Sequence, residues 1–526
     1  MVYDTDVVVV GSGVAGALLA RELMSAGLGV TILEAGETWQ RGESFTRYMQ
    51  SWNRTITAPF KPASWAPIPA DHSYFAGKGN KKYQPAFLKG VGGTTRQWTG
   101  ITPRFLPADF ELHSRYGIGT DWPISYDELE PYYVRAEYQM GVSGDSDDHH
   151  GSPRSKSYPM SAIPMTYSDQ VIAKRLASSG VRIASFPAAR NSRAYDGRPA
   201  CRGNNSCTPL CPIGASYSAD VDIEKSVAMG ARLTTKAVVY RFEVDKQKRI
   251  RRAFYKHPDG STHSIAARHF VLACNSIETP RLLLMAANRD SPNGLANSSG
   301  QVGRNLMDHV IFVSKFNMPE AMYLGRGPQS VSTILAGRDG PFRSKYAAAK
   351  FFLGNDLNIQ QEAAGMLRDD GNWLEPLKQL KEAAIHQGQI GAEVEQLPNA
   401  GSRLLLDKKR TDPLGLPLPN INYRLSDYTK KGVEVWQKYA RSLIHTLDAT
   451  EIDSSFSLSS HHPCGTTRMG RSAKDSVVNE QCQSHDHDNL YIIGGSVFPA
   501  MGTANPTLTI AALSIRLADY IKRVEK

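Results

Sequence analysis

The sequence has no apolar run of about 18 residues, the length that a helix needs to cross a bilayer. Residues 1–6 lack the basic segment that opens a secretory signal, and the apolar stretch after them reads as a strand of the fold. We therefore expect no secretory signal in this chain. Long basic runs are also absent, although 61 Lys and Arg outnumber 51 Asp and Glu. A dispersed surface charge that attracts anions is thus favoured over nucleic-acid binding.

Cysteine is scarce, with six residues in a chain of 526. So few cysteines at such uneven spacing argue against a disulfide framework. Cys274, Cys464 and Cys482 are dispersed, and we interpret them as ordinary packed thiols. The length of the chain predicts two or more packed units rather than one domain.

The other three cysteines, Cys201, Cys207 and Cys211, lie together in a stretch rich in Pro and Asn. A structural zinc site needs four ligands, and no fourth Cys or His is nearby in the sequence. Iron–sulfur centres are bound by thiolates, and a Cys-Pro pair at the end of a cysteine run is common in such sites. Three thiolates suit a 3Fe-4S cluster, one for each iron, and the alternative is three structural thiols in a loop.

The most informative segment is the beginning of the chain. Residues 7–10 read as a buried strand, residues 11–16 as a glycine turn, residues 17–26 as a helix and residues 29–33 as a second strand that ends at Glu34. This order predicts a dinucleotide-binding βαβ unit. Gly11 then permits the tight turn, Gly13 admits a pyrophosphate, Gly16 allows close packing of helix and strand, and Glu34 accepts hydrogen bonds from a ribose. The unit alone leaves NAD and FAD open.

Further elements follow from periodicity and turn residues. A second glycine-rich turn at residues 89–98 either brings backbone amides to a ring or phosphate or is a flexible loop. Residues 37–85 and 143–160 read as irregular. We expect helices at 129–136, 219–229, 279–287, 373–387, 427–446 and 511–521, and strands at 231–235, 237–244, 252–255, 263–266, 269–274 and within 391–408.

Two loops near the end of the chain combine polar side chains with Pro and Gly. His462 precedes Pro463 and a Cys-Gly pair, and Asn505 precedes Pro506. Such neighbours restrict loop geometry, which is one way to hold a catalytic group, although a single histidine can equally be structural.

These motifs together resemble the glucose-methanol-choline (GMC) oxidoreductase family. The resemblance is carried by GSGVAG with Glu34, GVGGTT at 90–95, GRNLMDH at 303–309, HPCGTTRMG at 462–470 and NPTLTIAAL at 505–513. The segment 191–215 is similar to a narrower bacterial group, the cytochrome-linked sugar, sugar-acid and polyol dehydrogenases. The resemblance implies an α/β fold with a Rossmann-like FAD-binding domain (1–45, 86–115, 216–310 and 456–526). It also implies an α+β substrate domain with an antiparallel sheet (46–85, 116–190 and 311–455) and an iron–sulfur loop (191–215).

The family pattern assigns roles to individual positions. His462 corresponds to the histidine that accepts the proton of the substrate hydroxyl, and Asn505 corresponds to its partner. Gln97 stands near the position at which some relatives attach FAD through histidine, so we expect non-covalent FAD. Glu395 resembles part of an active-site wall. His461 matches no family role, and we interpret it either as a residue that supports the site from behind or as a structural one. The cofactor-binding positions implied are Gly11, Gly13, Val14, Ala15, Gly16, Glu34, Gly92, Gly93, Thr94, Thr95, Val239, Gly495, Asn505 and Thr507.

The resemblance also implies an electron path. A 3Fe-4S cluster on Cys201, Cys207 and Cys211 would carry electrons from the flavin to a multihaem cytochrome c subunit, and a small subunit with a twin-arginine signal would carry the chain to the periplasmic face of the inner membrane. A cytoplasmic location is the alternative. The cysteines favour a dehydrogenase over a peroxide-producing alcohol oxidase, and a non-catalytic flavin-binding scaffold is a third possibility. Departures in the HPCGTT and NPT motifs favour gluconate or a polyol as substrate.

Overall fold

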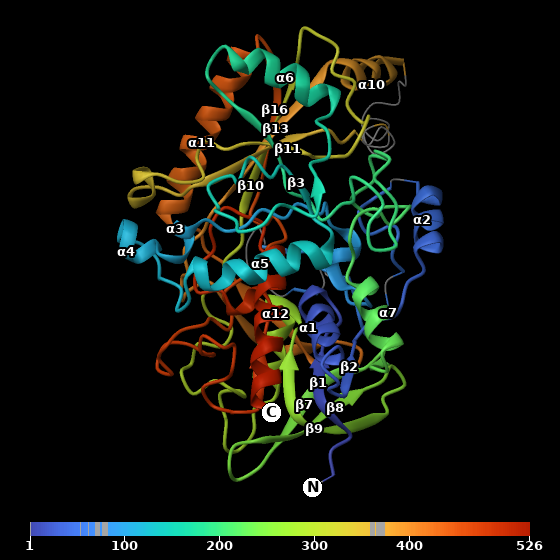
Figure 1. The fold of residues 1–526 in the computed structure, drawn as a ribbon, viewed down its shortest axis with the longest axis vertical. Coiled ribbons are helices and arrows are strands. Elements are labelled where there is room, and N and C mark those ends of the chain that lie inside the picture. Colours follow the sequence, from blue (N-terminus) through green and yellow to red (C-terminus); the bar gives the residue numbers. More distant parts are fainter. Residues whose placement is uncertain are drawn as a thin grey trace.

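The computed structural model describes residues 2–52, 54–61, 63–68, 74–75, 83–357, 363 and 374–525. Its elements form two units stacked along the long axis of the molecule (Figure 1). The lower unit holds β1, β2, β7, β8 and β9 together with both chain termini, and the upper unit holds β10, β13, β16 and helix α11.

The lower unit is built on a mostly parallel sheet. Strands β6 (Arg232–Thr234), β2 (Val30–Leu33), β1 (Thr5–Val10), β9 (Thr262–Leu272) and β17 (Leu490–Ile492) run parallel in that order. Strands β8 (Ile250–Lys256) and β7 (Val238–Val244) continue antiparallel from β9. β1, β2 and β17 are almost entirely apolar because parallel strands are covered on both faces.

Helices complete this unit. α1 (Val14–Met24) packs against α12 (Thr507–Val524) and α7 (Asp220–Ala228), and α5 (Tyr126–Met140) packs against α12. α8 (Asn275–Met285) follows β9 directly. The first and last helical segments of the chain therefore lie side by side, and they share one hydrophobic core with the sheet.

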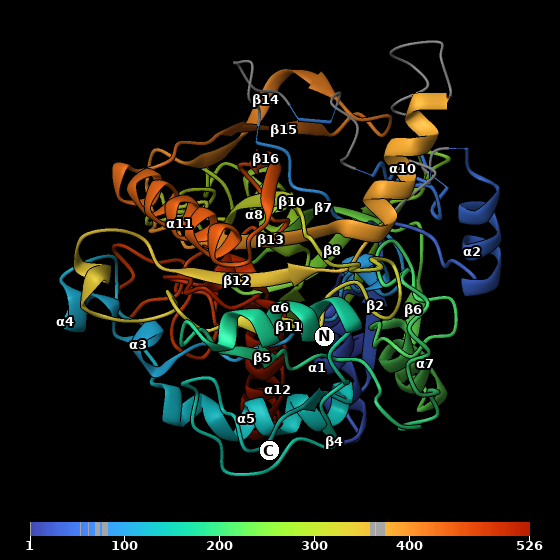
Figure 2. The same ribbon diagram turned by 90° about the horizontal axis from the view of Figure 1, so that it is seen from above.

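The upper unit has its own core around a four-stranded antiparallel sheet. The strand order is β12 (Ala349–Gly354), β13 (Gln387–Val394), β10 (Val310–Asn317) and β16 (Thr450–Ser457). Helix α11 (Asp427–Thr446) packs on β13 and β10, as the view from above shows (Figure 2). Its apolar side chains Val433, Trp436, Ala440 and Leu443 recur at helical spacing and are buried in that core.

The chain contains further helices and strands. They are α2 (Arg41–Gln50), α3 (Pro107–Phe110), α4 (Leu112–Tyr116), α6 (Tyr167–Ala177), α10 (Leu374–His386), β3 (Ser143–Gly144), β4 (Met160–Ser161), β5 (Ile183–Ser185), β11 (Ser332–Ile334), β14 (Arg403–Thr411) and β15 (Pro417–Asn422), with 3-10 helices η1 (Gly93–Gln97), η2 (Pro341–Ser344) and η3 (Gly495–Val497). Among the residues described here, no helix is both long and apolar enough to span a membrane.

The structure confirms the predicted fold class and the βαβ unit. The helix expected at 427–446 matches α11, and the helix expected at 129–136 is the middle of a longer one. Other expectations were wrong. The segment 37–85 contains helix α2, and the strands expected at 263–266 and 269–274 are parts of one continuous strand, β9. The domain boundaries predicted from the sequence stay predictions, although the two separate cores agree with a division into two units.

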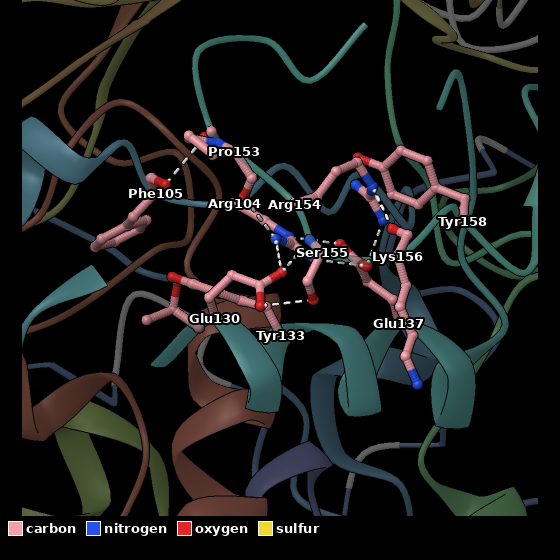
Figure 3. A network of polar contacts seen from close by, with 12 residues as sticks. Arg104, Phe105, Glu130, Tyr133, Glu137, Pro153, Arg154, Ser155, Lys156 and Tyr158 are labelled. Carbon is pink, nitrogen blue, oxygen red and sulfur yellow. Dashed lines mark hydrogen bonds and ion pairs between the residues drawn. The ribbon is translucent and has the colours of Figure 1, made fainter. Parts of the chain in front are cut away.

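A buried ionic network ties α5 to the loop that follows it (Figure 3). Arg104 donates to both carboxylate oxygens of Glu137 at 2.8 and 2.9 Å, and Arg154 donates to the same carboxylate at 2.7 Å. The Arg104 carbonyl accepts from Arg338, whose Nε also donates to the hydroxyl of Thr503 at 3.3 Å. Arg338 therefore links this network to Thr503, in the loop that carries Asn505.

Candidate active site

A cavity of about 1130 Å³ receives residues from both units. Its lower wall comes from the turn after β1, the end of β2 and strand β7, and its upper wall comes from β12 and β13. The loops around His462 and Asn505 close it from the C-terminal part of the chain.

The cavity collects most of the site residues predicted from the sequence. Those that line it are Gly11, Gly13, Val14, Ala15, Glu34, Gly93, Thr94, Thr95, Val239, His462, Gly495, Asn505 and Thr507. Gly16 and Gly92 lie behind this surface, and the three clustered cysteines lie outside the lining. Gln97 also lines the cavity, and an amide cannot form the covalent bond that histidine forms in some relatives.

Two glycines of the first turn have different surroundings. A Cβ on Gly16 would lie 2.0 Å from the carbonyl oxygen of Gly11, so only glycine lets α1 pack against β1. A Cβ on Gly13 would meet no atom within 4 Å, which leaves space for a ligand to approach the backbone. Gly93 packs against Gly13 and thereby brings the second glycine-rich turn, which forms η1, onto the first.

Glu34 is buried at the end of β2. One of its carboxylate oxygens accepts from the backbone N–H and the hydroxyl of Ser12 at 3.0 and 2.6 Å, and the other accepts from Gly36 N–H at 2.9 Å. These bonds hold the carboxylate at the cavity wall, in the place expected for a ribose-binding acid.

His462 and Asn505 meet in the cavity although 43 residues separate them. The Nδ2 of Asn505 lies 3.2 Å from Nε2 of His462, and the backbone N–H of His462 donates to Asp308 at 2.9 Å. The His462 side chain is 16% exposed, so one edge of the ring is open to a ligand.

His309 decides which nitrogen of His462 carries the proton. Nε2 of His309 lies 2.7 Å from the carbonyl oxygen of Gly502, which can only accept, so that nitrogen bears the hydrogen. Burial lowers the pKa of His309, which keeps the ring neutral and leaves a lone pair on its Nδ1. The Nδ1 of His462, 3.0 Å away, must therefore donate to it. Nε2 of His462 is left as the free base that faces Asn505 and the cavity.

Lys350 and Glu393 surround this pair. Lys350 donates to Oδ1 of Asn505, which turns the amide so that its N–H faces His462. Lys350 also pairs with Glu393 at 2.5 Å, and Oε1 of Glu393 lies 3.7 Å from Nδ1 of His462. Burial lowers the pKa of His462 to about 3, and Glu393 opposes that effect. The free site thus holds a neutral base beside a carboxylate that would stabilise its protonated form.

Among the described residues, His309, Glu393 and His462 also form the one group of three ligand atoms within 4.8 Å of one another. The two Nδ1 atoms share a hydrogen bond, and Lys350 already neutralises Glu393. The group is better explained as a hydrogen-bonded catalytic assembly than as a metal site.

Glu395 does not line the cavity, so its predicted place in an active-site wall was wrong. It is fully buried and pairs with Arg343 at 2.6 Å, while Arg343 also binds Asp109 at 2.9 Å. Glu393, two residues earlier, supplies the cavity carboxylate instead. His461 accepts from Ala86 N–H at 3.0 Å and also lines the cavity, so both interpretations of this residue stay predictions.

Sequence reasoning missed Glu393, His309 and Lys350. His309 closes the GRNLMDH motif, which was used for the resemblance without a role for its histidine. Lys350 is a charged residue within the otherwise apolar strand β12, and an unexplained charge of this kind was the available signal.

The cysteine loop is closed at its base and touches the cavity at its tip. Asn191 N–H donates to Ala215 O at 3.0 Å, and Tyr217 N–H donates to Ala189 O at 2.8 Å. All three thiols of the loop are free and partly exposed. Asn205, Ser206 and Pro209 of the same loop line the cavity.

The sulfur atoms of this loop receive few protein hydrogen bonds. Gly203 N–H donates to Sγ of Cys201 at 3.4 Å. Burial raises the pKa of the Cys201 thiol, and the neighbouring Gly203 N–H and Arg190 oppose that effect. Several buried side-chain atoms around the loop have no hydrogen-bond partner within the described part of the chain, and they belong to Arg190, Asn191, Ser192, Arg198, Ser206 and Ser216. Such a concentration of unpartnered groups is expected where a polar or charged group is bound.

Comparisons with known proteins agree with this architecture. Residues 8–311 and 398–514 match the N- and C-terminal parts of GMC oxidoreductase. The chain is 39% identical to the fructose dehydrogenase large subunit of Gluconobacter japonicus, over 98% of both chains. It is 25% identical to the gluconate 2-dehydrogenase flavoprotein of Pantoea cypripedii, over 98% of this chain and 93% of the relative.

A solved structure shows the same fold. The crystal structure of pyridoxine 4-oxidase from Mesorbium loti superposes with a TM-score of 0.66 at 17% identity, and it covers 98% of this chain and 99% of that one. Together with the match to both family segments, this establishes what kind of protein the sequence encodes. The chain belongs to the GMC oxidoreductase family, with a FAD-binding domain joined to a sheet-containing substrate domain.

Proposed function

We propose that the protein is a FAD-dependent dehydrogenase that oxidises a secondary or hemiacetal hydroxyl of a sugar, polyol or sugar acid. The single observation that carries this proposal is the pair formed by His462 and Asn505 in the cavity lining, with the unprotonated Nε2 of His462 facing Nδ2 of Asn505. Membership of the GMC family and similarity to sugar and sugar-acid dehydrogenases support it.

The residues present suit FAD. Gly13 leaves space for a pyrophosphate beside the backbone, Glu34 is placed for the ribose, and Val239 lies in the wall expected for the adenine. When bound, the flavin supplies a hydride acceptor. Gln97 supports a non-covalent cofactor, as the sequence predicted.

The side chains of the site can prepare an alcohol for oxidation. A substrate hydroxyl that displaces the hydrogen bond between the two side chains would donate its proton to Nε2 of His462 and accept from Nδ2 of Asn505. Removal of the proton makes the carbinol carbon a hydride donor. The resulting imidazolium is stabilised by Glu393, and Lys350 keeps the Asn505 amide turned toward the substrate oxygen.

We further propose that Cys201, Cys207 and Cys211 hold a 3Fe-4S cluster that passes electrons outward. The three sulfurs do not converge within 4.8 Å, the spacing of ligands around one metal ion, whereas a cluster binds each thiolate through a different iron. The unpartnered polar atoms around the loop fit a bound anionic group, and the loop tip at the cavity gives electrons a short path.

By the same resemblance, we propose a multihaem cytochrome c subunit as acceptor and a small subunit with a twin-arginine signal as escort. The chain would then act at the periplasmic face of the inner membrane. Active enzyme found only in the cytosol on cell fractionation would contradict this location.

The test is anaerobic bleaching of the bound flavin by a panel of sugars, polyols and sugar acids. The motif departures favour gluconate or a polyol, whereas the higher identity to a fructose dehydrogenase subunit favours a sugar, so fructose, sorbitol, glucose and gluconate head the panel. H462A should keep FAD and reduce it at least about 10²-fold more slowly.

Other results would assign another function. A flavin that no member of the panel bleaches would support a non-catalytic scaffold. Peroxide formed in step with substrate, from protein without iron, would establish an alcohol oxidase instead.

A further inference from the structure

Arg190 is a buried arginine that lacks the partners expected of one. Arg190 is only 1% exposed, and its Nη2 donates to the carbonyl oxygen of Thr99 at 2.6 Å. Its Nε and Nη1 have no hydrogen-bond partner among the described residues. The guanidinium therefore keeps its charge and two unused donors inside the protein.

Arg198 and Arg338 are also buried without a carboxylate partner among the described residues, but each donates to backbone carbonyls through two of its nitrogens. Several other buried arginines are paired with carboxylates. Arg104 binds Glu137, Arg281 binds Asp412 at 2.7 Å, and Arg343 binds Asp109 and Glu395. A buried ion without a counter-charge costs several kcal/mol, which is why charges inside proteins are normally paired. Arg190 has no carboxylate partner in the described parts of the chain, so the fold leaves room for an anion of another kind.

Arg190 lies next to the loop that carries the three clustered cysteines. Arg190 lies at the closed base of the cysteine loop, where it bridges to Ser216. The next residue, Asn191, accepts the backbone N–H of Cys201 at 2.8 Å. Ser206, one residue before Cys207, also has a buried hydroxyl without a partner.

We infer that Arg190 is the counter-charge and hydrogen-bond donor of the anionic centre that Cys201, Cys207 and Cys211 hold. This inference rests on the cluster in the proposed function. Three thiolates and the inorganic sulfides make such a centre anionic, and one more electron makes it more so. A fixed cation with free N–H groups stabilises the reduced form more than the oxidised form, which raises the reduction potential.

The experiment compares R190Q with R202Q in the purified holoenzyme. Both substitutions remove one positive charge, but Arg202 is exposed beside Cys201, so water and salt screen it. Iron and acid-labile sulfide are measured per flavin. The midpoint potential of the cluster is then measured by a redox titration followed by electron paramagnetic resonance.

We expect R190Q to shift the ratio of oxidised to reduced cluster at least about tenfold toward the oxidised form, which equals about 59 mV for one electron. R202Q should shift the ratio less than about threefold, because an exposed charge acts weakly. R190K keeps the charge but loses the planar fork of donors. Its midpoint potential should therefore lie between that of the wild type and that of R190Q.

Each result is decisive. R190Q with full iron and an unchanged potential would overturn the inference and leave the cluster in place. Wild-type protein with flavin but without iron and sulfide would overturn the cluster itself, while the flavin-bleaching test would still judge the dehydrogenase. If R190Q does not fold, R190K replaces it, and an unchanged potential in R190K then overturns the inference.

Discussion

His462 should remain an active base at a pH where an ordinary histidine is already protonated. Burial lowers its pKa to about 3, against the opposing effect of Glu393. Since the pKa is lowered, the neutral form persists as the pH falls and is lost only near pH 3. At pH 5 a histidine with a pKa of about 6.5 is about 97% protonated, whereas one with a pKa of about 3 is about 1% protonated.

The rates follow from these fractions. An ordinary histidine would slow flavin reduction by about 30-fold between pH 8 and pH 5, and His462 should change it by only a few per cent through its own titration. The assay is stopped-flow reduction of the flavin by saturating substrate without oxygen, at pH values from 8 to 4.5. Flavin content is checked at each pH so that loss of cofactor is not read as loss of rate.

Several titratable groups face this ring. Asp308 accepts from the backbone N–H of His462, and His309 and Glu393 lie near its Nδ1. Lys350 donates to Asn505, which in turn contacts His462. Burial raises the pKa of Asp308 to about 6, so this carboxyl gains a proton within the tested range. H462A serves as the reference. If its rate of flavin reduction still falls as the pH is lowered, that fall comes from groups other than His462. The reasoning would be refuted if the rate of flavin reduction in the wild type fell with a midpoint near pH 6.5 and this fall were absent in H462A.

Three further predictions concern other parts of the molecule. K350M should destabilise the protein by about 3–5 kcal/mol because Glu393 is left buried and unpaired, and adding E393Q should recover part of the melting temperature. C207S should leave flavin reduction by substrate intact while it lowers iron content and the rate of cytochrome reduction, and equal cytochrome rates would contradict the relay. G16A should lower the melting temperature of the apoprotein, because its Cβ would lie 2.0 Å from Gly11 O. G13A should leave that temperature unchanged and weaken FAD binding, and the opposite order of effects would contradict the roles given to the two glycines.

Much of the fold could be predicted because its signals are local. Val7 to Val10, the glycines after them and Glu34 lie within one short segment, and spacing alone specifies the βαβ unit. Helix α11 was predicted with its correct bounds because apolar residues recur along it at helical spacing. Helix α2 was missed since it has only two buried residues, and so its apolar pattern is weak.

The candidate site was predictable only in part. His462 and Asn505 stand in Pro- and Gly-containing loops that attract attention, and the structure brings them to 3.2 Å. The sequence prediction placed Glu395 at the site, whereas Glu393 lines the cavity. The pattern of a strand does not show at which residue the strand ends, nor which carboxylate will form an ion pair with a buried arginine such as Arg343. The isolated position of Arg190 also has no sequence signal, since an arginine without a partner cannot be recognised before the fold shows its surroundings.

The sequence by itself therefore determined the nucleotide-binding unit, the two C-terminal loops and the cysteine cluster, all of which depend on neighbouring residues. Only the tertiary structure decided which nitrogen of His462 is the base. That choice depends on a chain of hydrogen bonds from Gly502 through His309 to His462, and from Lys350 through Asn505. These residues come from distant segments, and their donors and acceptors are matched only when folding brings them within hydrogen-bond distance.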